Sequence, residues 1–399
     1  MNADARITSF VTTAREAITS MLADLVAIQT VNPPGLAYRE CVDFFSRVLA
    51  DWGIDHHVVT AAAGDHPRFS IIASLGTGEP GLHFHGHYDV VSAQSPEQFQ
   101  PQARNGRLYG RGTADMKGGI VAMLFALRAI QQCGITLSNA VTLTLVPDEE
   151  TGGRLGMRHL FAEGLLPAPR FGVLMPEPSR GVIWNACRGA LTVRIGVTGT
   201  PTHGAMPQAG PNAFEGMVRV AGALAAVRAR VVDRRTALPM TPPEASRSVM
   251  LIGGASGSGA DFNMVPASAW FSIERRFNPE ETLAQVRAEL EEVVERHRAE
   301  GLKIDVETFQ ENDACVSPAA APLGATLAQA IHDVTGTPAR FELCPGVLET
   351  RFFCRDGTPG YGYGPGLLEV SHGPDEYVDL KALVDCTAAY ALTAARLLG

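Results

Sequence analysis

A single carboxylate lies among four glycines in the segment Gly110-Arg111-Gly112-Thr113-Ala114-Asp115-Met116-Lys117-Gly118-Gly119. Glycines close to an acid indicate a backbone that turns sharply and approaches a ligand closely. The apolar run at 120–130 that follows has helical spacing. By itself such a pattern is more often a surface turn with a solvated carboxylate. Together with the segments described next, it predicts that Asp115 holds two metal ions.

A row of imidazoles occupies a second segment, Leu82-His83-Phe84-His85-Gly86-His87-Tyr88-Asp89-Val90-Val91. In an extended strand alternate residues share a face, about 7 Å apart. His83, His85, His87 and Asp89 would therefore point the same way. A lone histidine in a strand is usually a core residue, but three with an acid favour metal binding. The spacing does not decide which histidine is the ligand.

Further acids follow apolar strands. The predicted strand at 140–146 ends in Pro147-Asp148-Glu149-Glu150, and that at 171–175 ends in Pro176-Glu177-Pro178. Alternating strands and helices predict a largely parallel sheet, whose functional crevice lies beyond the carboxyl ends of its strands. Acids gathered there repel one another unless a cation offsets them, the alternative being solvated loop acids. The acids concerned are Asp89, Asp115, Glu149, Glu150 and Glu177.

The length of 399 residues predicts two domains. Residues 188–309 read as strand, helix, two strands, helix and strand, which is the order of a ferredoxin-like unit. The α/β pattern resumes afterwards and includes His372 in a loop ahead of a final helix at 380–398. We therefore predict a catalytic metal-binding domain at 1–187 and 310–399, with an inserted domain at 188–309.

Composition restricts the partners. The net charge of −9 gives no reason to expect nucleic acid, and no apolar run reaches the roughly 18 residues of a membrane span. The N-terminal residues lack the basic and apolar segments of a signal peptide, so a cytoplasmic location is expected. Cysteines are never spaced as Cys-x-x-Cys, which argues against a thiolate zinc site. A small molecule is the expected substrate.

With these residues in view, nearly the whole chain resembles the M20 metallopeptidase family. Within it, the chain is most similar to the branch containing acetylornithine deacetylase and succinyl-diaminopimelate desuccinylase. The resemblance implies a zinc-exopeptidase-like α/β/α catalytic domain with an inserted ferredoxin-like α+β domain that acts in lid closure and dimerisation. The matching segments, in family order, are 86–91, 110–119, 148–150, Glu177-Pro178, Gly199 through His203-Gly204 to Asn212-Ala213, 275–279 and His372.

The resemblance also implies a two-metal site. His87, Asp115 and Glu177 would hold one ion, and Asp115, Glu150 and His372 the other. Zn²⁺ is the expected metal, and Co²⁺ and Mn²⁺ suit the same ligands. Asp89 is similar to the family acid that orients the imidazole of His87, whereas His83 and His85 stand where the family usually has apolar residues.

Roles for other residues follow from the same resemblance. Glu149 would act as general base, and His203 would stabilise the oxyanion, often from the partner subunit in this family, which implies a homodimer formed through the inserted domain. Cations near the site favour a substrate with a free carboxylate. The residues matching substrate-binding positions are Arg188, Asn263, Arg276, Arg351 and Gly364.

The chain is accordingly expected to be a dinuclear-metal amidohydrolase that cleaves an N-acyl amino acid or a similar small carboxylate-bearing amide. A metallo-dipeptidase or carboxypeptidase of the same family is the alternative. Glu rather than Asp at position 177 favours the deacylases. A binding protein that kept the fold but lost the chemistry would belong to a different class, and the intact ligand positions argue against it. Hydrolysis of an unusual amide, such as release of an aromatic amine, is compatible with the same residues.

Overall fold

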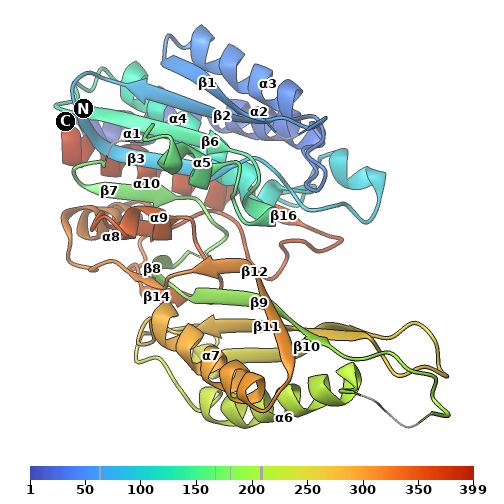
Figure 1. Ribbon diagram of the computed structural model, residues 1–399. Coiled ribbons are helices and arrows are strands. Elements are labelled where there is room, and N and C mark those ends of the chain that lie inside the picture. Colours follow the sequence, from blue (N-terminus) through green and yellow to red (C-terminus); the bar gives the residue numbers. More distant parts are fainter. Residues whose placement is uncertain (63, 167, 180, 207–209) are drawn as a thin grey trace. The chain divides into compact units, whose positions relative to one another are not determined.

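The computed structural model describes residues 1–62, 64–166, 168–179, 181–206 and 210–399 (Figure 1). The chain divides into two compact units. Unit 1 comprises Met1–Asn185, Ser317–Glu342 and Phe352–Gly399, and unit 2 comprises Ala186–Val316 and Leu343–Arg351. The sequence places the boundaries after residues 187 and 309. The second division comes later in the structure because strand pairing continues through Asn312.

Unit 1 is built on a mixed sheet with the strand order β1-β2-β6-β3-β7-β15-β8. Its central pairs β3–β6, β3–β7 and β7–β15 are parallel, whereas β1–β2, β2–β6 and β15–β8 are antiparallel. The expected parallel arrangement thus holds for the centre of the sheet, and the edges differ. The strands are β1 (Asp55–Ala61), β2 (Arg68–Leu75), β3 (Pro80–His87), β6 (Ala140–Val146), β7 (Gly172–Met175), β15 (Gly360–Gly362), β8 (Ile183–Cys187) and β14 (Phe341–Cys344), which pairs with β8.

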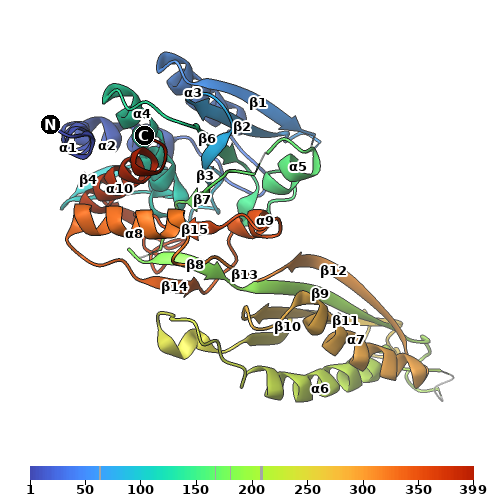
Figure 2. The same cartoon turned by 90° about the vertical axis from the view of Figure 1, so that its left-hand side faces the viewer.

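Helices cover both faces of this sheet (Figure 2). Neighbouring residues of β7 show the two faces: Leu174 belongs to the main core with α4 and α10, whereas Val173 packs with Met157 of α5 and Phe353 of α9. Unit 1 is therefore an α/β/α sandwich, as expected. Its helices are α1 (Ala3–Thr13), α2 (Arg15–Ala27), α3 (Tyr38–Asp51), α4 (Gly118–Gln132), α5 (Met157–Ala162), α8 (Pro322–Thr335), α9 (Thr350–Cys354) and α10 (Leu380–Leu398).

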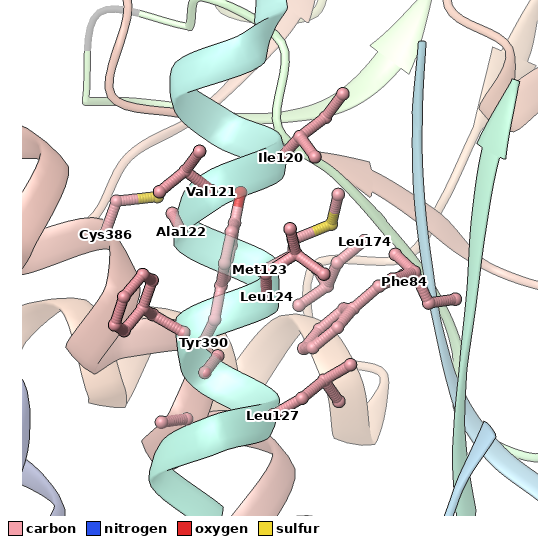
Figure 3. Packing of buried hydrophobic residues seen from close by; sticks show 14 of the residues in the cluster. Phe84, Ile120, Val121, Ala122, Met123, Leu124, Leu127, Leu174, Cys386 and Tyr390 are labelled. Carbon is pink, nitrogen blue, oxygen red and sulfur yellow. The ribbon is translucent and has the colours of Figure 1, made fainter. Parts of the chain in front are cut away.

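Helix α4 is apolar around its whole circumference and lies at the centre of the core. Figure 3 shows its side chains packed with Phe84 and Leu174 of the sheet and with Tyr390 of α10. The rings of Phe84 and Tyr390 lie 5.6 Å apart. Because α4 begins directly after the Asp115 segment, this burial fixes where that segment stands.

A small three-stranded sheet, ordered β16-β5-β4, completes unit 1. Its strands are β4 (Gln102–Arg104), β5 (Arg107–Tyr109) and β16 (Tyr377–Asp379), and Tyr109 pairs with Tyr377. The pairing brings the residues after β5 beside those before β16. Short helical turns lie at Pro96–Phe99, Glu149–Thr151 and Pro243–Ser246.

Unit 2 has the predicted ferredoxin-like order β9-α6-β10-β11-α7-β12. Its sheet is antiparallel, in the order β10-β11-β9-β12, with the helices packed on one face around a separate apolar core. The elements are β9 (Gly189–Thr198), α6 (Ala213–Val231), β10 (Val249–Ser258), β11 (Ser268–Phe277), α7 (Leu283–Ala299), β12 (Lys303–Asn312) and the short β13 (Cys315–Val316), which pairs with the end of β8. Among the described residues, no helix has the length and apolarity needed to cross a membrane.

A substitution at Gly119 of α4 tests how closely this helix approaches Pro176, the residue that follows β7. A Cβ atom at this position would lie 2.3 Å from Cβ and 2.6 Å from the carbonyl oxygen of Pro176. Gly119→Ala should lower the free energy of unfolding by about 1–3 kcal/mol because backbone must shift. Gly222→Ala in α6 is the matched control, since nothing lies within 4 Å of its added methyl. It should be neutral or stabilising by up to about 1 kcal/mol in urea unfolding. Equal effects of the two substitutions would contradict this account.

Candidate metal centre

Four side chains of unit 1 converge around Asp115. The first group is His87, Asp115 and Glu177, and the second is Asp115, Glu150 and His372; within each group the candidate ligand atoms lie within 4.8 Å of one another. His87 Nε2 is 3.3 Å from Asp115 Oδ1, and His372 Nε2 is 3.4 Å from Asp115 Oδ2. The two oxygens of one carboxylate thus face two different imidazoles.

His87 is the last residue of β3 and is oriented by Asp89. Its Nδ1 lies 3.1 Å from the carbonyl oxygen and 3.4 Å from Oδ1 of Asp89. With Nδ1 committed to these acceptors, Nε2 points at Asp115 and lies 3.9 Å from Glu177 Oε1. Asp89 therefore stands where an acid that orients a ligand imidazole is needed.

The loop that carries Asp115 turns through glycine. Gly112 has φ of 85°, and a Cβ atom there would lie 2.7 Å from Val90. Asp115 itself has extended backbone angles, and the peptide bond that follows it is cis. Lys117 is fully buried, and its Nζ donates to the carbonyls of Leu25 (3.0 Å) and Ile28 (2.7 Å) at the end of α2. The carboxylate is thus held between a tight turn and a buried anchor.

The turn after β6 presents Glu149 and Glu150. Their backbone amides donate to the two carboxylate oxygens of Asp89, each at 3.2 Å. Asp148 has a left-handed conformation and accepts from the Thr151 hydroxyl at 2.6 Å. These contacts hold the turn so that Glu150 Oε1 lies 3.2 Å from His372 Nε2.

Electrostatic balance in the cluster comes from its imidazoles. Burial opposes protonation of His87, but Asp115 and Asp89 outweigh it and raise its pKa well above the usual value. Asp115 and Glu150 raise the pKa of His372 to about 10. Burial opposes ionisation of Asp115, yet the two imidazoles hold its pKa below the usual range. Burial, followed by the Asp115 charge, raises the pKa of Glu177 well above its usual value.

These residues fit a pair of divalent cations. Within the described chain, Asp115 Oδ1 is buried and accepts no hydrogen bond, although it faces an imidazole. Nitrogen and oxygen donors of this mixture suit Zn²⁺ and similar transition metals. Cations bound here would offset the charge of Asp115 and favour ionisation of Glu177.

His83 and His85 have a different role from His87. Thr144 Oγ1 lies 2.9 Å from His83 Nε2 and 2.8 Å from His85 Nδ1, and Thr142 Oγ1 lies 2.7 Å from His83 Nδ1. Neither histidine belongs to a candidate ligand group of the described residues. The sequence left open which histidine of the row is a ligand. In the parallel β3–β6 ladder His83 is paired with Thr142 and His85 with Thr144, so their rings contact threonine hydroxyls.

The other candidate residues belong to unit 2, apart from Gly364, whose amide donates to Ser179 Oγ at 3.2 Å. Arg188 is buried and donates to Asn278 Oδ1 (3.1 Å) and to the carbonyls of Ala245 and Arg247. Arg351 is also buried and donates to Asn312 Oδ1 at 2.9 Å.

Arg276, Asn263 and His203 are more accessible. Arg276 pairs with Glu274 and keeps about a third of its side chain exposed. Asn263 and His203 are exposed. His203 Nδ1 accepts from the amide of Ala205 at 3.1 Å, so the hydrogen of its neutral ring is on Nε2.

Several supporting residues were missed from the sequence. Asn32 donates to Asp89 Oδ2 at 2.9 Å and to Thr151 Oγ1 at 2.9 Å, and Glu376 accepts from the loop of Asp115. Asn32 lies more than fifty residues from its partners, so no spacing pattern could find it. Glu376 was visible only as an acid near His372.

Most of the chain matches a known protein family. Residues 83–396 match the model of the peptidase family M20/M25/M40. A succinyl-diaminopimelate desuccinylase of Gluconobacter oxydans is 30% identical over 390 residues, covering 93% of this chain and 95% of that protein.

Solved structures share the fold. An M20 family metallo-carboxypeptidase from Sulfolobus solfataricus superposes with a TM-score of 0.77 and 15% identity, covering 95% of this chain and 99% of its own. A dinuclear metal-binding M20 peptidase from Bacillus subtilis gives a TM-score of 0.68 and 15% identity, with 97% and 99% covered. At this identity the likeness shows the fold alone.

The buried His83 makes stability depend on acid. Burial, followed by His85, lowers the pKa of His83 from 6.5 to about 3. Between pH ~6.5 and ~3, His83 is therefore protonated in the unfolded chain but neutral in the folded protein. The free energy of unfolding decreases as the pH falls through this window, by up to ~1.4 kcal/mol per pH unit.

In His83→Leu, the slope of unfolding free energy against pH between 6 and 4 should be shallower by up to ~1.4 kcal/mol per unit. Urea unfolding of metal-free protein at a series of pH values measures it. His332→Leu removes an exposed histidine and should keep the wild-type slope. An unchanged slope in the His83 variant would show that this imidazole does not resist protonation.

Proposed function

This chain belongs to the peptidase family M20/M25/M40, and we propose that it removes the acyl group from an N-acyl amino acid or a similar small amide that carries a carboxylate. As a member of the family it is a hydrolase of amide bonds. The proposal for the acyl substrate is supported by the near full-length relative from Gluconobacter oxydans, whose own substrate is a succinylated amino acid by name. The observation that carries the chemistry is the convergence of four candidate ligand side chains on a fifth, Asp115.

We propose that His87, Asp115 and Glu177 hold one ion and that Asp115, Glu150 and His372 hold the other. Zn²⁺ is the preferred assignment, and Co²⁺ or Mn²⁺ would suit the same donors. Two bound divalent ions supply Lewis-acid polarisation of the amide and a water that loses its proton near neutral pH. Asp89 keeps the imidazole of His87 in the tautomer and direction that ligation needs.

Glu149 is the proposed general base. Its amide donates to Asp89, as that of Glu150 does, and its charge raises the pKa of both His87 and Glu177, although its side chain belongs to neither ligand group. It would take a proton from water and return it to the leaving nitrogen.

His203 is proposed to donate a hydrogen bond to the developing oxyanion from the partner subunit of a homodimer. Its Nε2–H and its exposure suit a donor that meets a ligand. Unit 2 offers a surface for the second copy: β10 is at the end of its sheet, and α6, which packs beside β10, exposes Phe214 and Val218. An exposed edge strand with an apolar neighbour suits symmetric pairing of two copies.

The substrate carboxylate is proposed to meet the candidates Arg188, Asn263, Arg276, Arg351 and Gly364. Among the arginines, Arg276 is the best candidate to bind the substrate carboxylate. Its side chain is partly exposed, and a substrate carboxylate could replace its partner Glu274. Arg188 and Arg351 are weaker candidates, because both are buried and donate to Asn278 and Asn312 respectively. The proposed cytoplasmic location is derived from the sequence and is tested by fractionation.

A metallo-dipeptidase or carboxypeptidase is the second candidate, because the matching family model is that of a peptidase family. Parallel assays with N-acetyl and N-succinyl amino acids and with a dipeptide panel distinguish the two. A preference of tenfold or more in kcat/KM for the acyl amino acids supports the proposal, and the reverse preference supports the alternative.

Glu149→Gln should lower kcat by about 10²–10⁴-fold because proton transfer is lost. Both metal ions should remain, as measured by elemental analysis after desalting. Glu163→Gln, at an exposed position after α5, is the control and should retain wild-type turnover. Activity within tenfold of the wild type in Glu149→Gln would exclude this residue as the base.

Mixing two inactive variants tests whether His203 acts across the dimer. Glu149→Gln and His203→Ala homodimers should each be nearly inactive. After subunit exchange, heterodimers combine Glu149 of one copy with His203 of the other, so about a quarter of all sites are restored. Activity rising to about that level supports action from the partner, whereas no recovery despite proven exchange would place His203 in its own subunit's site.

A further inference from the structure

A buried ion pair joins the two loops that supply Asp115 and His372, two of the three ligands of the second ion group. Arg111 and Glu376 pair directly, and their side chains are 1% and 0% exposed. Arg111 lies four residues before Asp115, and Glu376 lies four residues after His372. The pair is outside both ligand groups.

Glu376 holds the loop of Asp115 through its backbone. Its Oε1 accepts from the amides of Gly112 (3.0 Å), Ala114 (3.0 Å) and Asp115 (3.2 Å). Backbone amides that converge on one oxygen form a cradle for an anion, here filled by a side chain of the protein itself. The turn around Asp115 is therefore shaped on the Glu376 carboxylate.

Arg111 holds the loop of His372. Its Nη2 donates to the carbonyl oxygens of His372 (3.2 Å), Gly373 (3.3 Å) and Ser92 (3.4 Å), while Nη1 pairs with Glu376 Oε2. Gln98 adds a contact from Nε2 to the carbonyl of Gly373 at 3.0 Å. His372 has φ of 63°, a backbone conformation that such contacts must stabilise.

Strand pairing explains why the two residues meet. Tyr109 of β5 pairs with Tyr377 of β16, and the amide of Gly110 donates to the carbonyl of Glu376 at 2.9 Å. The ladder delivers Glu376 to the start of the glycine-rich turn. The distance between Asp115 and His372 is thus set by elements outside the ligand set.

We propose that the Arg111–Glu376 pair is a positioning element that determines the affinity of the second ion group, Asp115, Glu150 and His372, more than that of the first. Two of the three ligands of the second group lie on the loops that the pair joins. The first group has one ligand there, Asp115, while His87 ends β3 and Glu177 follows β7. This inference rests on the proposed two-ion site.

Zn²⁺ titration of the metal-free protein, followed calorimetrically, tests the asymmetry. In Glu376→Gln one Zn²⁺ should bind with nearly wild-type affinity, and the other should bind about 10- to 100-fold more weakly, as for other residues that orient metal ligands. Absorption spectra during Co²⁺ titration should show the loss at one site only. Arg111→Lys keeps the positive charge but loses the two-nitrogen contact of the guanidinium group. It should weaken binding of the same Zn²⁺ by a smaller factor, and it serves as the test if Glu376→Gln does not fold.

Glu281→Gln is the matched control, because Glu281 is a buried carboxylate paired with Arg275 and Arg234 in unit 2. It should lower thermal stability while both Zn²⁺ affinities stay as in the wild type. Equally weakened binding of both Zn²⁺ ions, or unchanged affinities in folded Arg111 and Glu376 variants, would overturn this inference and leave the proposed function standing. Wild-type protein that takes up no Zn²⁺ would overturn the proposed function as well.

Discussion

Repulsion among buried carboxylates is the constraint on which the organisation of unit 1 depends. Asp115, Glu150 and Glu177 lie close together, with Asp89 directly behind them. Removing such groups from water is costly unless each finds a positive partner or a hydrogen-bond donor. In this protein two imidazoles and a series of backbone amides provide that compensation, and bound cations would complete it.

Compensation of this kind requires stiff loops. A metal ligand that moves by a fraction of an ångström loses much of its contribution, so the loops need anchors as strong as the ligands. Lys117 anchors the Asp115 loop to the end of α2, and Asn32 joins Asp89 to the turn after β6. The Arg111–Glu376 pair joins the Asp115 loop to the His372 loop. Burial of α4 between the sheet and α10 provides the rigid base beneath them (Figure 3).

The same fold is shared by peptidases that differ in what they hydrolyse, because specificity lies in groups that the scaffold leaves free to vary. The candidate metal ligands here lie at or just after strand ends and in turns, and His372 is the most exposed of them. The candidate substrate residues are mostly in unit 2, where Arg188 and Arg351 are already engaged within the protein and Arg276 is more accessible. On the proposed assignments, chemistry and substrate choice would be carried by different parts of the chain.

Local pattern determined much of this protein in advance. The ferredoxin-like order of unit 2, strand β6, helix α10 and the acids at strand ends all follow from periodicity and turn residues, which act over a few neighbours. The resemblance to a family added the proposed ligand set, because the residues that carry it occur in short segments. Tertiary structure decided what depends on register and on distant contacts: that His83 and His85 pair with threonines, that the sheet is antiparallel at its edges, and that Asn32 and Glu376 support the site. These contacts join residues far apart in the chain, and their energy depends on a geometry that exists only once the sheet and its helices have assembled.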